Sequence, residues 1–149
     1  MQKKGDEALG RSRGGFSTKL HCSCDSRGHA VELCLGPGQE SDIGRAPDLL
    51  GDHQPGAVIA DKAYDADVFL GMVSAREAQV VIPPTKTRTI QRRYSKGKYK
   101  QRNLIERFIN RMKHYRRVAT RYEKTARNFL AFTHIAASLV MLGVTVNTT

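Results

Sequence analysis

The sequence is short of cysteine and of an apolar leader. Its three cysteines, Cys22, Cys24 and Cys34, are an odd number and form no Cys-x2-Cys pair. Phe16, Thr18, Leu20, Cys22 and Cys24 alternate along a predicted strand, which explains two of the cysteines as small buried residues and argues against a zinc cluster with His21 and His29. The first ten residues lack the apolar core of a signal peptide. A reducing cytoplasm is therefore the predicted setting.

Acidic residues are scarce in the second half of the chain. Residues 85–127 hold sixteen Lys and Arg but only two acidic residues, Glu106 and Glu123. Residues 1–84 hold nine basic and twelve acidic side chains, and residues 128–149 carry no Asp, Glu, Lys or Arg. Such a cationic block attracts polyanions, and duplex nucleic acid is the commonest candidate. A solvated surface or a ribosome-like basic tail is the alternative.

The order of elements predicts an α/β protein. At 149 residues the chain fits a single domain. A flexible basic loop is expected over 1–15 and a cationic, mobile loop over 85–98. Apolar patterns predict strands over 16–24, 29–35, 57–60 and 79–82, and helices over 41–51, 65–78 and 100–145, the last divided near residue 126. Asp65 or Asp67 is expected to cap the second helix. The uncharged run 129–146 favours a buried terminal helix over a membrane span.

Glu106 stands in a distinctive spacing, Tyr99-x2-Arg102-x3-Glu106-x6-Lys113. At 100° per residue these four positions fall within an arc of roughly 60° on a helix. A carboxylate among so many cations is usually a neutralised ion-pair partner or a ligand for a metal that works on phosphate. The spacing favours the metal ligand, and Arg102 and Lys113 are then candidates to bind phosphate oxygens.

Asp61 follows a short apolar run, Ala57–Ala60, typical of a strand buried on both faces of a parallel sheet. The point where such a strand enters a loop is the crevice position of open α/β sheets. Asp61 is therefore a second candidate metal ligand. The alternative interpretation is that Asp61 only ends the strand or caps the next helix.

Several strings resemble the DDE transposases of bacterial insertion sequences, in particular the insertion-sequence-five group. They are GRSRGGFSTKLH, the PGQ at 37–39, the Asp61 string ADKAYD and RNLIERFINRMKHYRRVATRYEK. The resemblance implies a ribonuclease-H-like mixed sheet with flanking helices. It makes Asp61 and Glu106 catalytic ligands of Mg²⁺, with Mn²⁺ able to substitute, and Tyr99, Arg102 and Lys113 DNA-binding residues. Arg11, Arg13, Lys19 and Arg116 are further candidates for phosphate contacts.

The implied activity is metal-dependent phosphodiester cleavage and strand transfer at insertion-sequence ends. The implied partners are double-stranded DNA, both ends and target, and further subunits of an oligomer, with no membrane. DDE enzymes use three carboxylates, and relatives place the first on a strand upstream of the GRSRGG segment. That first strand is expected to be missing here, since Asp6 lies in a polar, glycine-flanked tail.

The chain by itself is therefore expected to be inactive, as the second frame of a frameshifted element or as a remnant. An upstream-frame polypeptide is a candidate partner. Three alternatives stay open: a non-catalytic DNA-binding derivative that competes for transposon ends, an unrelated basic structural or RNA-associated protein, and a host nuclease of similar fold.

Overall fold

The computed structural model describes residues 7–144, so Asp6 and the end of the 129–146 run lie outside the described residues. Contacts divide the chain into two units. Unit 1 combines Met1–Glu40 with Leu104–Thr149, and unit 2 is Ser41–Asn103. Both units contain strands and helices, which confirms the α/β class.

Unit 1 is built on an antiparallel sheet in the order β1–β2–β3. Its strands are β1 (Gly10–Ser12), β2 (Gly15–Cys24) and β3 (Ala30–Pro37). The β2–β3 turn forms because the Asp25 carboxylate accepts the N–H groups of Arg27 and His29, and because Gly28 takes a φ of 79°. The expected loop over 1–15 is wrong in part, because Gly10–Ser12 form β1 and pair with residues 15–17 of β2.

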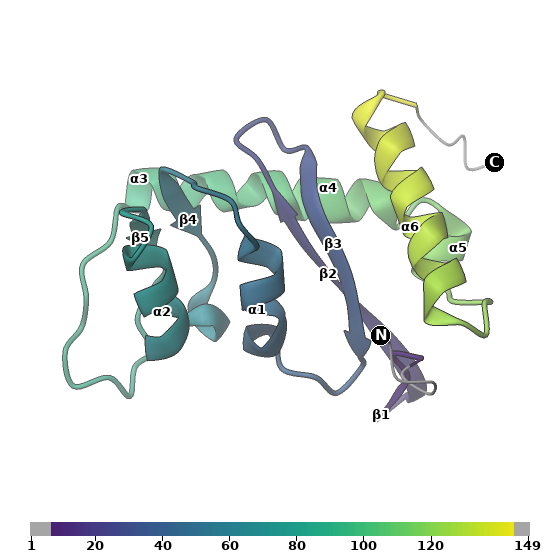
Figure 1. Ribbon diagram of the computed structural model, residues 1–149, viewed down its shortest axis with the longest axis horizontal. Coiled ribbons are helices and arrows are strands. Elements are labelled where there is room, and N and C mark those ends of the chain that lie inside the picture. The colour runs from purple at the N-terminus through teal and green to yellow at the C-terminus, as the bar shows by residue number, and fades with distance from the viewer. Residues whose placement is uncertain (1–6, 145–149) are drawn as a thin grey trace. The chain divides into compact units, whose positions relative to one another are not determined.

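Helices of unit 1 cover this sheet. They are α4 (Asn103–Met112), α5 (Arg116–Ala119) and α6 (Ala126–Met141), and α4 passes behind the β2–β3 hairpin in Figure 1. Thr125 starts α6, since its side chain accepts the N–H of Asn128. One side of α4 is buried: Phe108 and Met112 lie in one core with Leu33 of β3 and with residues of α6. In residues 7–144 no helix is long and apolar enough to cross a membrane.

Unit 2 holds a parallel pair of strands flanked by helices (Figure 1). Its elements are α1 (Asp42–Leu50), β4 (Ala57–Ile59), the 3₁₀ helix η1 (Lys62–Tyr64), α2 (Asp67–Ser74), β5 (Gln79–Val81), α3 (Lys96–Tyr99) and the 3₁₀ helix η2 (Lys100–Arg102). The buried core consists of Ala46, Leu50, Phe69, Val73, Ala78 and Ile82. The parallel pairing is confirmed, but β4 is half-buried rather than buried on both faces.

Two further predictions for unit 2 need correction. α2 is capped by Ala66 without a side-chain hydrogen bond, so neither Asp65 nor Asp67 serves as its cap. α3 begins at Lys96, inside the expected loop over 85–98, because the Ser95 hydroxyl accepts the N–H of Lys98. The single-domain organisation and the ribonuclease-H-like arrangement stay predictions.

Candidate functional site

Asp61 lies where the predicted strand ends. β4 runs from Ala57 to Ile59, and the N–H of Ala60 donates to the carbonyl of Val81 at 3.3 Å, which continues the pairing with β5. Asp61 then starts η1: its Oδ1 accepts the N–H of Ala63 at 2.9 Å. The capping role is therefore real. It also fixes one carboxylate oxygen and leaves the half-exposed side chain at the mouth of a parallel strand pair.

Arg102 and Tyr99 come together with Asp61 in unit 2. The Nη1 of Arg102 lies 3.6 Å from the Oδ2 of Asp61, and the side chains are 33% and 41% exposed. The Arg102 guanidinium also lies over the ring of Tyr99, 5.7 Å from its centroid. A long, half-exposed ion pair of this kind contributes at most about 1 kcal/mol. Arg102 thus compensates the Asp61 charge loosely and can exchange it for another anion.

Glu106 and Lys113 belong to unit 1. Glu106 is an exposed residue of α4, and Lys113 follows the last turn of that helix, where its N–H donates to the carbonyl of Ile109. Both line a surface depression together with Ile105, Ile109 and Asn110. Glu106 therefore lies beside the partly buried Ile105 and Ile109, at the edge of the buried side of α4.

The five predicted site residues divide between the units: Tyr99, Arg102 and Asp61 in unit 2, Glu106 and Lys113 in unit 1. A shared metal site of Asp61 and Glu106 stays a prediction. Among residues 7–144, no three His, Cys, Asp or Glu side chains are grouped so that they could hold a metal ion. Asp61 nevertheless fits a Mg²⁺ ligand, because its carboxylate is a hard oxygen donor, is half-exposed and is oriented by Ala63.

A buried carboxylate with several hydrogen-bond donors, that of Asp65, is a feature that the sequence does not predict. The Asp65 side chain is fully buried and accepts hydrogen bonds from three donors in the loop 85–98. These donors are the Thr85 N–H at 2.7 Å, Nε of Arg88 at 2.7 Å and Nη2 of Arg92 at 3.1 Å. Arg92 also donates to the carbonyl of Ile82 at 2.7 Å. We call Asp65, Thr85, Arg88 and Arg92 the Asp65 clamp. It fastens part of the loop that was expected to be mobile.

The clamp also sets the charge state of Asp65. Burial by itself acts to raise the pKa of this carboxyl, but hydrogen bonds from the Thr85 N–H and from Arg88 and Arg92 outweigh it and lower the pKa below its ordinary value. Asp65 is therefore an ionised, saturated carboxylate and is not available to a metal. The sequence contains the arginine-rich segment that supplies these partners, but the partners lie 20 to 27 residues after Asp65, and no local pattern links them to it.

Two of the weaker phosphate candidates already have partners inside the fold. The Nζ of Lys19 donates to the carbonyl of Glu40 at 2.8 Å. The Nε of Arg116 donates to the hydroxyl of Tyr122 at 3.0 Å, and its guanidinium lies 5.9 Å from the centroid of that ring. The side chains of Lys19 and Arg116 are therefore already engaged within the fold.

Comparison with known proteins places these residues in a family. The fold defines an α/β protein with an acidic residue at the end of a parallel strand. Residues 58–143, from β4 to the end of α6, match the model of the transposase DDE domain. The matched segment contains Asp61, Tyr99, Arg102, Glu106 and Lys113. No solved structure matches the chain.

A curated relative supports the same assignment over a longer stretch. The chain is 39% identical over 133 residues to the "Putative transposase for insertion sequence element IS6501" of Brucella ovis. That alignment covers 85% of this chain and 99% of the relative. The chain belongs to the DDE transposase family of insertion sequences.

Proposed function

We propose that this chain contributes Asp61 and Glu106 as metal ligands to a DDE transposase that cleaves and joins DNA at insertion-sequence ends. The observation that carries the proposal is the position of Asp61: it ends a parallel strand, its Oδ1 is oriented by the Ala63 N–H, and its side chain remains half-exposed. Membership of the family supports the reaction class.

The metal of this site is Mg²⁺, with Mn²⁺ able to substitute, because carboxylate oxygens are the ligands that these hard cations prefer. When bound, the metal supplies activation of the attacking oxygen and stabilisation of the leaving oxygen. Arg102 screens Asp61 in the metal-free chain and binds a phosphate oxygen of DNA in the complex. Lys113 binds a second phosphate, and Tyr99 holds Arg102 in place through its ring.

The proposed fold is a ribonuclease-H-like mixed sheet that contains the β1–β2–β3 sheet and the β4–β5 pair. A further strand with the third carboxylate comes from an upstream-frame polypeptide. The parallel pairing of β4 and β5 and the antiparallel β2–β3 hairpin are the parts of such a sheet that support the proposal. Since this chain contributes two of three ligands, we expect it to be inactive alone and to act as part of an oligomer on DNA in the nucleoid.

End cleavage tests the proposal. The chain is assayed with Mg²⁺ on DNA carrying the element's ends, alone and then joined in frame to the upstream polypeptide. We expect cleavage only in the joined form, and a loss of at least about a hundredfold in Asp61→Asn and Glu106→Gln, since each lost ligand removes several kcal/mol of transition-state stabilisation. Cleavage by the chain alone would contradict the two-ligand account.

Matched controls separate chemistry from folding. Asp48→Asn removes a similar exposed pair, with Arg45 at 3.5 Å, and Glu77→Gln removes an exposed glutamate of unit 2. Both should leave cleavage intact. Asp61→Asn should lower the free energy of unfolding by less than about 1 kcal/mol, because asparagine also caps helices and the Arg102 pair is weak. Equal activity of Asp61→Asn and Asp48→Asn would refute the assignment.

The second candidate is a DNA-binding derivative that competes for transposon ends. Residues 85–127 hold sixteen basic and two acidic side chains, and this positive charge favours DNA binding. It predicts binding to the ends without cleavage in any joined or mixed form. Asp61→Asn should then bind DNA as well as the unmodified chain.

A further inference from the structure

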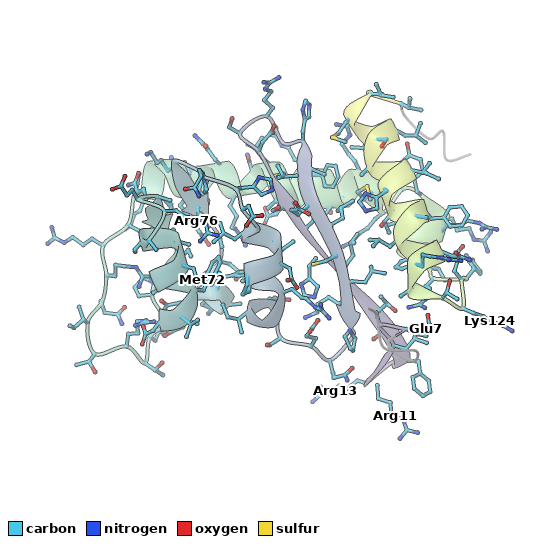
Figure 2. The ribbon with its side chains drawn as sticks, in the orientation of Figure 1. Glu7, Arg11, Arg13, Met72, Arg76 and Lys124 are labelled. Atoms are coloured by element: carbon cyan, nitrogen blue, oxygen red, sulfur yellow. The ribbon has the colours of Figure 1, made fainter. Side chains whose placement is uncertain are left out.

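The turn between β1 and β2 presents two arginines and a phenylalanine to solvent. Arg11 and Phe16 face each other in the strand register, and Arg13 occupies the turn itself. Gly15 has a φ of 103°, which favours glycine and keeps the turn tight. Figure 2 shows Arg11 and Arg13 projecting beyond the ribbon at this turn. We call residues 11–16 the arginine turn.

The arginine turn is fastened at its base. The Thr18 hydroxyl donates to the carbonyl of Ala8 at 2.7 Å. Nη1 of Arg121 donates to the carbonyl of Glu7 at 2.6 Å and to the Thr18 hydroxyl at 2.7 Å. The carboxylate of Glu7 in turn accepts the N–H of Ala126 at the start of α6. The exposed side chains are thus held on an anchored hairpin, so little ordering is needed when they bind.

The exposed side chains of the turn are unusual for a surface that meets only water. Phe16 is 71% exposed, and the Arg11 guanidinium lies 5.7 Å from the centroid of its ring. Within residues 7–144, no carboxylate forms an ion pair with Arg11 or Arg13. By contrast, Arg117 pairs with Glu123 at 3.1 Å. Two arginines with their charge available, beside an exposed ring, match the chemistry of a phosphate backbone with its sugars and bases.

We propose that the arginine turn is a contact site for duplex DNA, in which Arg11 and Arg13 bind phosphate oxygens and Phe16 packs against sugar or base atoms. The proposal rests on the proposed function, because it assumes that the chain binds DNA. It adds a site in unit 1 that lies outside the Tyr-Arg-Glu-Lys spacing and outside the matched segment 58–143.

The salt dependence of binding tests the arginine turn. Affinity for a fluorescent duplex that carries the element's end is measured by anisotropy over a range of salt concentrations, with the full chain and its variants. The slope of log K against log salt is about −0.9 per phosphate contact, so Arg11→Gln and Arg13→Gln should each reduce its magnitude by about 0.9. By the same relation, the affinity lost through each substitution should be about eightfold greater at 0.1 M salt than at 1 M salt.

The β2–β3 turn offers a matched control. Arg27 is exposed at the other end of β2, so Arg27→Gln removes the same charge from the same sheet and should leave the slope unchanged. Phe16→Ala should weaken binding at every salt concentration without changing the slope. Arg11→Lys with Arg13→Lys should keep the slope, because the charge remains, and this variant separates a lost contact from a folding defect.

The possible failures are distinguishable. If the unmodified chain binds duplex DNA but the Arg11→Gln, Arg13→Gln double variant matches Arg27→Gln in slope and affinity, the arginine turn is not a contact site and the proposed function is unaffected. If the unmodified chain shows no salt-dependent binding to duplex DNA, both proposals are wrong. Tighter binding to an RNA duplex of the same sequence would overturn the assignment of DNA as the partner.

Discussion

Replacing Asp65 by asparagine removes the one negative charge at the centre of the Asp65 clamp while keeping the size of the side chain. The carboxylate is fully buried and accepts three hydrogen bonds, two of them from guanidinium groups that are 25% exposed. Asparagine can accept one or two of these bonds and cannot balance Arg88 and Arg92. The change therefore leaves Arg92 facing a neutral group, while Arg88 keeps its ion pair with the exposed Asp67.

The contacts set the size of the effect. Hydrogen bonds to a charged group contribute about 1.5–3 kcal/mol each, and removing one partner of a fully buried pair costs about 3–5 kcal/mol. Because both arginines keep access to water, the lower part of that range applies. We expect Asp65→Asn to reduce the free energy of unfolding by about 2–3 kcal/mol. Asp67→Asn is the control: its carboxylate is 86% exposed and pairs with Arg88 at 2.7 Å, so its loss should cost less than about 1 kcal/mol.

Urea unfolding measures the difference, and limited trypsin digestion locates it. Cleavage after Arg88 and Arg92 should accelerate in Asp65→Asn, because these residues lose the carboxylate that holds them. The effect should also depend on pH. The folded-state pKa of Asp65 lies below its ordinary value of 3.8, so its contribution is present above that value and is lost as the pH falls through the folded-state pKa. The free energies of unfolding of the unmodified chain and of Asp65→Asn should therefore converge in acid. An Asp65→Asn chain as stable as Asp67→Asn at neutral pH would refute the clamp.

Two further outcomes follow from unit 1. Burial is the main cause, and the nearby Cys24 and Cys34 the lesser one, that raises the pKa of Cys22 to about 12. Iodoacetamide at pH 8 should therefore leave Cys22 unmodified in the folded chain and alkylate it after denaturation, which mass spectrometry measures. Arg121→Ala removes the hydrogen bonds that join the base of the arginine turn to the segment before α6, and it should lower the free energy of unfolding in urea by about 2–3 kcal/mol. The exposed Arg127→Ala should be nearly neutral, and equal unfolding midpoints of the two variants would contradict the anchoring role.

Local patterns predicted much of the fold. The apolar side of α4 and the long apolar run of α6 depend on neighbouring residues, and the structure confirms both helices. The alternation over 16–24 predicted a strand correctly but not its buried face, because Phe16 is exposed, Cys22 and Cys24 are only half-buried, and His21 is the buried residue. The short apolar runs at 57–60 and 79–82 predicted the parallel strand pair, although β4 proved half-buried. Asp61 was placed correctly at a strand end because a strand end is visible as the point where an apolar run stops.

Contacts between distant residues could not be predicted in the same way. Asp65 looked like a helix cap because an acidic residue before an apolar run usually is one, yet its partners lie in the loop after β5. The ion pair of Asp61 with Arg102 was missed for the same reason, since it joins residues 41 positions apart. The glycines around β1 predict a loop because glycine has low strand propensity, and pairing with β2 overrides that propensity.

Iron-mediated cleavage of the polypeptide can test the proposed metal centre of Asp61 and Glu106. Fe²⁺ that replaces Mg²⁺ generates radicals with ascorbate and peroxide, and these cut the backbone beside the bound metal. We expect cuts near residues 61 and 106 together, suppressed by excess Mg²⁺ and absent in Asp61→Asn, but retained in Asp48→Asn. Cuts at only one of the two segments, or cuts that Asp61→Asn leaves unchanged, would contradict the proposed metal centre.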